Sequence, residues 1–343
     1  MEFKKYNSIT NSYEDEFIVK VKMKNLDEYK WCITEKIHGS NTCICYDSIN
    51  DTISYGKRTA FLEKGEKCYN VQECFNDIND KIKKLHSIYK ESKGVAPDSI
   101  IIFGEVCGGS YPHPDVPRDN KATKVQKGVF YSNTNKWVAF DIAVKEPNSE
   151  HYIYLPSSEF FKICEELEIP TVPILAIVDT FDEALKYPNA GQSVLHKQFG
   201  LPALPDNIME GVVIKPYNID AFIGQSRVVI KNKNDKFKEK SHEKRINIQK
   251  ELPEDIAKVS AELETYVTEN RVNNILSHYG EMSKSEKIRN LGMFIAETNK
   301  DIIAEAEREG VFNILHNRKG DIKMATKSLN AKVANLVKSI ILS

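Results

Sequence analysis

Lys36 and the residues after it form the segment of this chain best suited to covalent chemistry. Lys36-Ile37-His38-Gly39 follows an alternating apolar stretch and sets a lysine three residues before a glycine. A lysine amine can attack the phosphorus of a nucleotide, and a glycine leaves room for phosphate to approach the backbone. The spacing alone is weak evidence, because Lys197-Gln198-Phe199-Gly200 has it too. Support must therefore come from residues elsewhere in the chain.

Three residues farther along could hold the rest of a nucleotide. Arg58 follows a predicted strand, and its fork of donors suits phosphate or ribose. Glu105 follows a short apolar strand through a glycine, where a carboxylate can accept hydrogen bonds from ribose hydroxyls. Phe140 closes another predicted strand and can stack on a purine. Taken singly, Arg58 is better explained as a solvated strand end, Glu105 can be an ordinary surface glutamate, and Phe140 is equally well explained as a core aromatic residue.

Two later segments add charge to this set. Glu210 stands before the apolar strand 211–214, and Lys215 stands after it. Lys231 and Lys233 are two residues apart and so share one face of a predicted strand. Two ammonium groups facing a cleft require an anion, such as a triphosphate, although a solvated sheet face is the alternative. Together these residues predict a nucleotidyl-transfer site.

The elements that must position these residues form a mixed sheet followed by helices. Apolar patterning predicts these strands: 31–33, 42–46, 52–55, 100–103, 137–140, 211–214 and 227–230. A turn is predicted at 48–51. Residues 72–90 predict one helix with a buried stripe, and helices are also expected at 158–167 and 181–186. The last of these begins with a capping box formed by Thr180 and Glu183.

The character of the chain changes after Lys231. Residues 236–250 carry six basic residues against two acidic ones, and no convincing strand follows. Pro253 predicts the start of a long helix ending near residues 279–280, Ser283 and Glu286 predict a capped helix, and 321–342 predicts a last helix. We therefore expect an α+β fold, with a mixed or antiparallel sheet domain at 1–238 and an all-helical domain at 239–343. The basic stretch is either a nucleic-acid contact or a solvated linker.

Composition narrows the possible functions. With 343 residues the chain can form two domains, and its net charge of −1 argues against a uniformly basic nucleic-acid coat. The seven cysteines include no Cys-x-x-Cys pair, and Cys43 with Cys45 lacks a second ligand pair at metal-binding spacing. Buried thiols in a reducing compartment, and a cytosolic location, are expected. No apolar run reaches membrane-spanning length.

The ordered motifs resemble those of the covalent nucleotidyltransferases, and most closely the RNA ligase 2 family, which joins phage enzymes with kinetoplastid RNA-editing ligases. The segments that carry the resemblance are 35–41, 57–59, 103–105, 140–142, 210–215, 229–233 and, in the helical region, 270–274. His38 is the discriminating residue, because DNA ligases and capping guanylyltransferases usually have Asp before the motif glycine. The chain departs from the phage pattern at Thr34, where an arginine is usual, and Glu297 takes the place of an aspartate.

The resemblance implies an ATP-dependent RNA ligase that needs Mg²⁺, with Mn²⁺ as a substitute. Lys36 would form a lysyl-adenylate, AMP would pass to a 5′-phosphate of RNA, and a 3′-hydroxyl would then seal the strand, at nicks in duplex RNA. The implied catalytic residues are Lys36, His38, Glu210, Lys231 and Lys233. The implied nucleotide contacts are Glu35, Ile37, Asn41, Arg58, Glu105, Phe140 and Lys215. Glu210 and Asp141 would face the metal, and Arg271, Lys236 and Lys238 would contact RNA or pyrophosphate.

Two alternatives remain open. One is a GTP-dependent capping enzyme or a DNA ligase, against which His38 and the lack of predicted strands in the last hundred residues argue. The other is a non-catalytic RNA-binding relative with the same fold. The presence of Lys36, Glu210 and the Lys231/Lys233 pair argues against it, because a protein that only binds RNA needs no nucleophile.

Overall fold

The computed structural model describes residues 1–24, 26, 28–237, 253–315 and 318–342. The chain divides into two compact units, Met1–Lys236 and Phe237–Ser343. The first contains sheets and helices, and the described part of the second is entirely helical, so the predicted α+β fold class is confirmed.

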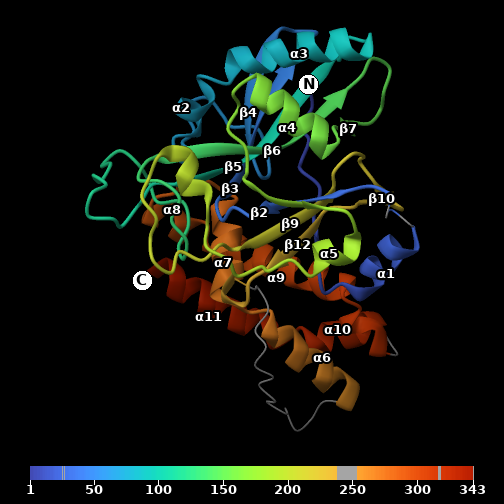
Figure 1. Ribbon diagram of the computed structural model, residues 1–343. Helices are drawn as coiled ribbons and strands as arrows, with labels where there is room; N and C mark the ends of the chain where they lie inside the picture. Colours follow the sequence, from blue (N-terminus) through green and yellow to red (C-terminus); the bar gives the residue numbers. More distant parts are fainter. Residues whose placement is uncertain (25, 27, 238–252, 316–317, 343) are drawn as a thin grey trace. The chain divides into compact units, whose positions relative to one another are not determined.

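The first unit contains two five-stranded sheets and a two-stranded hairpin (Figure 1). One sheet has the order β4-β3-β5-β6-β7 and is antiparallel throughout. Its strands are β3 (Ser40–Asp47), β4 (Thr52–Lys57), β5 (Ser99–Gly108), β6 (Asn135–Lys145) and β7 (Ile153–Tyr154). The other has the order β1-β12-β9-β2-β8, with β1 and β12 parallel. Its strands are β1 (Thr10–Asn11), β2 (Trp31–Glu35), β8 (Ile174–Val178), β9 (Gly211–Pro216) and β12 (Ile230–Lys233). The hairpin strands are β10 (Phe222–Ile223) and β11 (Ser226–Arg227).

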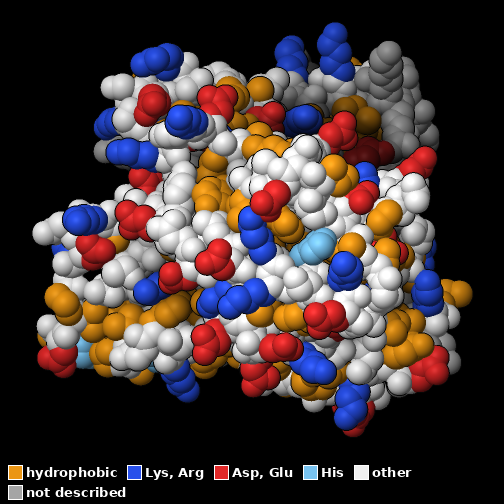
Figure 2. All heavy atoms as spheres, turned by 90° about the horizontal axis from the view of Figure 1, so that it is seen from above, with side chains coloured by type: hydrophobic (Ala, Val, Ile, Leu, Met, Phe, Trp, Pro, Cys, Tyr) orange, Lys and Arg blue, Asp and Glu red, His pale blue; other side chains and the backbone are white. Residues whose placement is uncertain are grey.

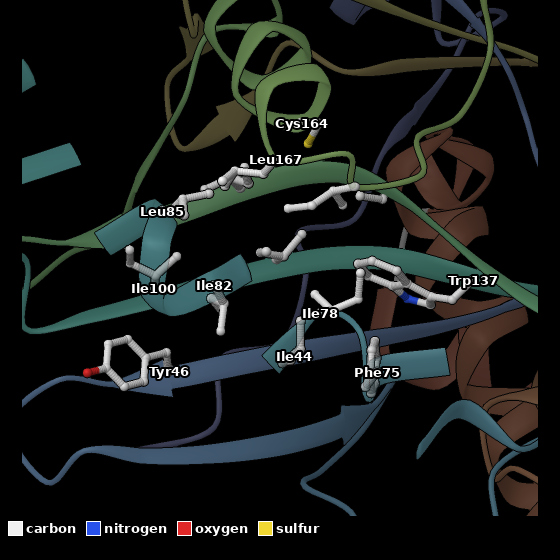
Figure 3. Close-up of a cluster of buried hydrophobic side chains, with 14 of the residues drawn as sticks. Ile44, Tyr46, Phe75, Ile78, Ile82, Leu85, Ile100, Trp137, Cys164 and Leu167 are labelled. Atoms are coloured by element: carbon white, nitrogen blue, oxygen red, sulfur yellow. The ribbon is translucent and has the colours of Figure 1, made fainter. Parts of the chain in front are cut away.

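Helices cover one face of the β4-β3-β5-β6-β7 sheet, as Figure 3 shows. They are α2 (Val71–Phe75), α3 (Asn79–Lys93) and α4 (Ser157–Glu166). Ile44 and Ile100 point into this helix-covered core, whereas their neighbours Cys43 and Ile101 belong to a smaller cluster on the opposite face. This alternation is what a strand buried on both sides requires.

The prediction of one helix over residues 72–90 is wrong, because a turn separates α2 from α3. Asn76 and Ile78 donate backbone hydrogen bonds to residues three earlier, Glu73 and Phe75, rather than four. Such a turn advances the chain with little loss of helical phase. The predicted buried stripe therefore survives the break: Phe75, Ile78, Ile82, Leu85 and Tyr89 are all buried.

Strands β5 and β6 are longer than predicted and contain a bulge. Phe103 lies opposite Asp141, whereas Gly104 lies opposite Ala139, so Phe140 has no partner on β5. Gly104 also packs against the indole of Trp137, and a Cβ at this position would lie 2.3 Å from a ring carbon. Glu105 is consequently within β5 rather than beyond its end.

Two helices pack on the second sheet. α1 (Asp15–Met23) contributes Ile18 and Val21 to its core, and α5 (Phe181–Leu185) packs Phe181 against Trp31 with ring centroids 4.4 Å apart. The predicted capping box of α5 is present. Two short 3₁₀ segments complete the described elements: η1 (Leu195–Phe199) and η2 (Asp235–Phe237). β1 and α1 were not predicted.

The second unit is a set of helices around one apolar core. Its elements are α6 (Glu254–Thr265), α7 (Glu269–Ser277), α8 (Lys284–Arg289), α9 (Leu291–Arg308), η3 (Val311–Ile314), α10 (Arg318–Ala325) and α11 (Leu329–Leu342). The predicted long helix from Pro253 is wrong, because Thr268 caps a new helix by accepting from the backbone of Arg271. The predicted final helix is likewise two helices. The capping box at Ser283 is confirmed.

The structure also bears on the predictions about the cysteines and about membrane-spanning segments. All seven cysteines are free, and six of them are buried. Within the described ranges, no helix is both long enough and apolar enough to cross a membrane. The predicted cytosolic location stays a prediction.

Candidate active site

Lys36 lies where the chain passes from one sheet to the other. β2 ends at Glu35 and β3 begins at Ser40, in the second and first sheets respectively. The Lys36 N–H donates to the carbonyl of Gly211 on β9 at 2.9 Å, and the Glu35 N–H donates to Pro173 at 3.0 Å. These bonds hold the backbone of the crossing segment, so the lysine is presented on a well-supported loop.

Glu210 brings the charged residues of this site together. Its Oε2 lies 2.7 Å from Lys36 Nζ and 3.5 Å from His38 Nδ1, and its Oε1 lies 3.2 Å from Lys233 Nζ. The strands explain the meeting, because Gly211, the first residue of β9, pairs with Lys233 of β12. Lys231 lies two residues earlier on β12, partly buried, and by strand alternation on the same face as Lys233.

The charge state of Glu210 follows from these neighbours. The side chain is only 2% exposed, and burial alone would raise its pKa. Lys36, Lys233 and His38 outweigh this desolvation and hold the pKa of Glu210 well below its usual range. Glu210 is therefore an ionised hub between two lysines rather than a proton acceptor.

Glu105 is the second carboxylate near Lys36. It lies on β5 opposite Asn41 of β3, and the backbone of Gly39 forms a hydrogen bond to it. Desolvation, with a smaller contribution from Glu210, raises its pKa to about 8 against the opposing effects of Lys36 and Arg58. Asn41, Arg58 and Glu105 are thus gathered beside Lys36.

The structure explains why position 39 is a glycine, and the explanation differs from the one inferred from the sequence. We predicted that the glycine leaves room for phosphate. A Cβ at Gly39 would lie 2.2 Å from the carbonyl oxygen of Val106 and 2.8 Å from Cγ of Glu105. The absence of a side chain is therefore required by the close approach of β5.

Asp141 forms a separate buried ion cluster. Its Oδ2 accepts from Tyr6 at 2.7 Å, Lys215 at 3.2 Å and Arg227 at 2.5 Å, and its Oδ1 accepts from Arg227 at 3.2 Å. Burial would raise the pKa of Asp141, but Arg227 and Lys215 hold it below its usual range. Both oxygens of Asp141 thus contact protein cations in this structure, and its predicted metal role stays a prediction.

The same cluster changes the interpretation of Lys215 and Phe140. Lys215 Nζ also donates to the carbonyl of Phe140 at 2.8 Å, and the lysine is 6% exposed. Its ammonium contacts protein acceptors here, and its predicted contact with nucleotide stays a prediction. Phe140 remains partly buried at the bulge, in edge contact with Tyr6 at 4.9 Å between centroids.

The side chains of Glu35 and Ile37, on either side of Lys36, are both buried. Glu35 is 1% exposed, and its carboxylate accepts from Ser193 Oγ at 2.6 Å and from the Val194 N–H at 2.9 Å. Ile37 is 5% exposed. Their side chains support the loop from within, and their predicted role in nucleotide binding stays a prediction.

The predicted contact of Arg271 with RNA or pyrophosphate stays a prediction, and the structure shows where this side chain lies. Arg271 is fully buried in the second unit, where Asp301 and Glu305 pair with its guanidinium and the Tyr266 carbonyl accepts from Nε at 3.0 Å. Asp301 and Glu305 are thus acidic partners of this guanidinium.

The other two predicted contacts lie near the end of the first unit. Lys236 is exposed, with Nζ 3.5 Å from the carbonyl oxygen of Gly128. Lys238 lies outside the described residues.

Sequence reasoning missed several supporting residues. The Tyr131 hydroxyl accepts from the His38 N–H at 2.8 Å, and Gln126 donates to the Gly39 carbonyl at 3.2 Å. Arg227 was only placed on a strand, and Tyr6 was not considered. Each acts through a partner distant in sequence, so no local pattern could have revealed them.

The carboxylates near Lys36 limit how a metal could be held. In the described part of the chain, no three His, Cys, Asp or Glu side chains converge as metal ligands. Glu210 and Glu105 influence each other electrostatically beside Lys36. This set fits Mg²⁺, which often takes one or two protein carboxylates and fills its other positions with water and phosphate oxygens.

The site thus combines a lysine paired with a buried carboxylate, a second lysine on the same carboxylate, and another carboxylate nearby. This combination suits the transfer of a nucleotide to the lysine. The RNA ligase family model matches residues 29–233, and the model for the C-terminal region of T4 RNA ligase 2 matches residues 249–335. The chain belongs to the RNA ligase family, and its resemblance to the RNA ligase 2 group is confirmed.

Curated relatives agree with this membership. The mitochondrial RNA-editing ligase 2 of Trypanosoma brucei brucei is 28% identical over 177 residues, covering 48% of this chain and 42% of the relative. The mitochondrial RNA-editing ligase 1 of the same organism is 24% identical over 208 residues, covering 54% and 44%. This chain thus matches less than half the length of either relative.

Solved structures of a Naegleria gruberi RNA ligase are also similar. A mutant with AMP and Mn gives a TM-score of 0.42 at 16% identity, covering 68% of this chain and 57% of that one.

Proposed function

We propose that this chain is an ATP-dependent RNA ligase that works through a lysyl-AMP at Lys36. Family membership supports the reaction class. The contact of 2.7 Å between Lys36 Nζ and Glu210 is the single observation that carries the choice of nucleophile. Lys197, which has the same sequence spacing, is exposed on η1 and has no such setting.

In the first step, the Lys36 amine in its uncharged form attacks the α-phosphorus of ATP. A P–N bond forms, the bond from the α-phosphorus to the bridging oxygen breaks, pyrophosphate leaves, and the nitrogen gives a proton to solvent. Glu210 orients Nζ, and Lys233 can offset the charge on the phosphates once ATP enters. Catalysis then depends mainly on positioning and charge neutralisation.

The remaining nucleotide contacts follow from the geometry around Lys36. Glu105 would accept from ribose hydroxyls, and Arg58 and Asn41 would contact phosphate or sugar. Phe140, the unpaired bulge residue, would pack on adenine. Glu210 would hold a Mg²⁺ or Mn²⁺ ion, and such an ion would supply positive charge near the developing phosphoryl oxygens.

Two transfers to RNA complete the reaction. A 5′-phosphate oxygen of RNA attacks the AMP phosphorus, the P–N bond breaks, and Lys36 is regenerated. A neighbouring 3′-hydroxyl then attacks the RNA phosphorus and AMP leaves. We propose nicked duplex RNA as the substrate. The face in Figure 2 mixes acidic and basic side chains, in keeping with local RNA contacts rather than one broad basic field.

Labelling tests the first step. The protein is incubated with α-labelled ATP or GTP and Mg²⁺, then denatured and separated by electrophoresis. Label from ATP should remain on the wild type and on Lys197→Ala, and should disappear in Lys36→Ala. Label from GTP alone would favour the capping alternative, and no label from either would favour the non-catalytic RNA-binding relative.

Sealing assays test the substrate. RNA and DNA duplexes of matched sequence, each with one 5′-phosphorylated nick, are compared under the same conditions. Faster sealing of the nick with an RNA 3′-hydroxyl supports the proposal, whereas equal or faster sealing of the all-DNA nick contradicts it. Glu210→Gln should lower adenylylation by about 100-fold or more, because the amide cannot serve two ammonium groups as an ionised hub.

A further inference from the structure

A buried chain of hydrogen bonds begins at Glu35, immediately before Lys36, and returns to the loop at His38. It passes through Ser193, Asn207 and the 130–131 segment. We propose that Asn207 and Tyr131 are positioning residues that hold the Lys36 loop and Glu210 in register through this chain. The inference deepens the proposed function and rests on it.

The first link joins β2 to the segment before η1. Glu35 accepts from Ser193 Oγ at 2.6 Å and from the Val194 N–H at 2.9 Å. Both Glu35 and Ser193 are 1% exposed. A carboxylate held by two donors cannot rotate freely, so the end of β2 is fixed just before the nucleophile.

The second link passes through Asn207. Its carbonyl oxygen accepts from the Ser193 N–H at 2.8 Å. Its side-chain Oδ1 accepts from the Phe130 N–H at 2.8 Å, while Nδ2 donates to the Phe130 carbonyl at 2.7 Å. Asn207, 4% exposed, thus pairs with both backbone groups of one residue, as a neighbouring strand would.

The third link returns to the catalytic loop. Tyr131 follows Phe130, is 1% exposed, and accepts from the His38 N–H at 2.8 Å. Burial, with smaller contributions from Glu35 and Glu210, raises the pKa of Tyr131 well above its usual range, so the hydroxyl stays neutral. Gln126 of the same segment adds a bond to the Gly39 carbonyl at 3.2 Å.

Asn207 also controls the approach to Glu210, three residues later. The chain between them pairs with the 191–193 segment, through the bond from Met209 N to Gly191 O at 3.0 Å and a bridge between Gln192 and Ile208. One buried amide therefore links the segment that carries the carboxylate to the segment that supports the nucleophile. Buried polar groups that are paired in this way form a rigid network, whereas a half-satisfied network is costly.

Positioning predicts a selective kinetic defect. Lysyl-AMP formation requires Lys36 Nζ to be in line with the α-phosphorus, whereas sealing of an RNA that is already adenylylated forms no bond to Lys36. Asn207→Ala and Tyr131→Phe should each slow lysyl-AMP formation by about 10- to 100-fold. The apparent affinity for ATP, and the sealing of pre-adenylylated nicked RNA, should change much less.

The experiment measures the single-turnover rate of lysyl-AMP formation, its dependence on ATP concentration, and the sealing of pre-adenylylated RNA, with a thermal melt for each variant. Asn133→Ala and Tyr111→Phe are matched controls. Both lie in the same irregular segment and donate to carbonyls of Pro117 and Pro202, outside the chain of bonds. Their rates should equal those of the wild type.

Unchanged adenylylation in Asn207→Ala and Tyr131→Phe would overturn the inference. So would an equal fall in all steps together with a lowered melting temperature, since that pattern indicates general destabilisation. If Asn207→Ala does not fold, Tyr131→Phe decides, because it removes one hydroxyl and keeps the ring. A wild type that never forms lysyl-AMP would instead refute the proposed function.

Discussion

Arg227 donates to both carboxylate oxygens of Asp141, with Nη1 2.5 Å from Oδ2 and Nη2 3.2 Å from Oδ1. Lys215 joins the same carboxylate, so β6 of one sheet is ionically bound to β9 of the other. The Lys36 loop is a covalent passage between these sheets. The Asp141 cluster therefore helps to set the geometry that Lys36 depends on, without forming part of the group around Glu210.

Breaking this buried pair should destabilise the protein strongly. Asp141→Asn removes the carboxylate that Lys215 and Arg227 share and leaves Arg227 with Asp220, and we expect the free energy of unfolding to fall by about 3–5 kcal/mol. The double variant Asp141→Asn/Arg227→Met should lose less than the sum of the two single variants, because it leaves fewer buried charges unpaired. Denaturant unfolding measures all three. Additive losses would contradict the coupling.

Gly39→Ala should disrupt the loop, because its Cβ would meet the Val106 carbonyl at 2.2 Å. Backbone on both sides must shift, so we expect lysyl-AMP formation to fall by about 100-fold. Gly292→Ala is the matched control, since a Cβ in that part of α9 meets nothing within 4 Å. The control should raise stability by roughly 0.5–1 kcal/mol and keep activity. An active Gly39→Ala variant would refute the argument.

Glu105 should give the nucleotide-free protein a characteristic pH dependence. Its pKa is raised to about 8 by burial, so the folded protein keeps a proton that the unfolded chain has released. The free energy of unfolding should therefore fall as the pH rises from 4.5, the ordinary pKa of a glutamate, through about 8, the pKa of Glu105 in the folded protein. Chemical unfolding across this range, in wild type and Glu105→Gln, measures the effect.

The difference between the two pH profiles isolates Glu105. His196, whose pKa is lowered by burial, titrates in both proteins and cancels. Glu210, with its lowered pKa, contributes stability that is lost only as the pH falls below the same window. Identical slopes in the two proteins would refute a protonated Glu105.

Arg271 should matter for the stability of the helical unit rather than for contact with RNA. Arg271→Ala leaves Glu305 buried without its cation, so we expect a loss of about 3–5 kcal/mol in the free energy of unfolding. Thermal and denaturant unfolding measure this loss. If Arg271→Ala has normal stability but binds RNA less tightly, the result would support the predicted direct contact between Arg271 and RNA.

The sequence was sufficient where the signal is local. Alternating apolar residues located β2, β3 and β9, and the capping pairs at Thr180 and Ser283 marked the helix starts correctly. The order of motifs, rather than periodicity, placed Lys36 and Glu210 in one predicted site. These features depend on neighbours within a few residues or on a recognisable series.

The remainder depends on partners that no local pattern identifies. Asp141 carries the same charge whether it faces a metal or Arg227, and only the tertiary fold brings Arg227 of the β10-β11 hairpin to it. Phe140 is aimed by a bulge whose extra residue is invisible without β5. Thr268 ends one helix and begins another within an otherwise continuous apolar pattern.

The parallel pairing of β1 with β12 has a consequence for synthesis on the ribosome. Thr10 is opposite Ile230, so Thr10 is translated more than two hundred positions before its strand partner. Lys36 likewise emerges long before Glu210 and Lys233 exist to surround it. A nascent chain therefore cannot assemble this charged centre until translation has passed β12.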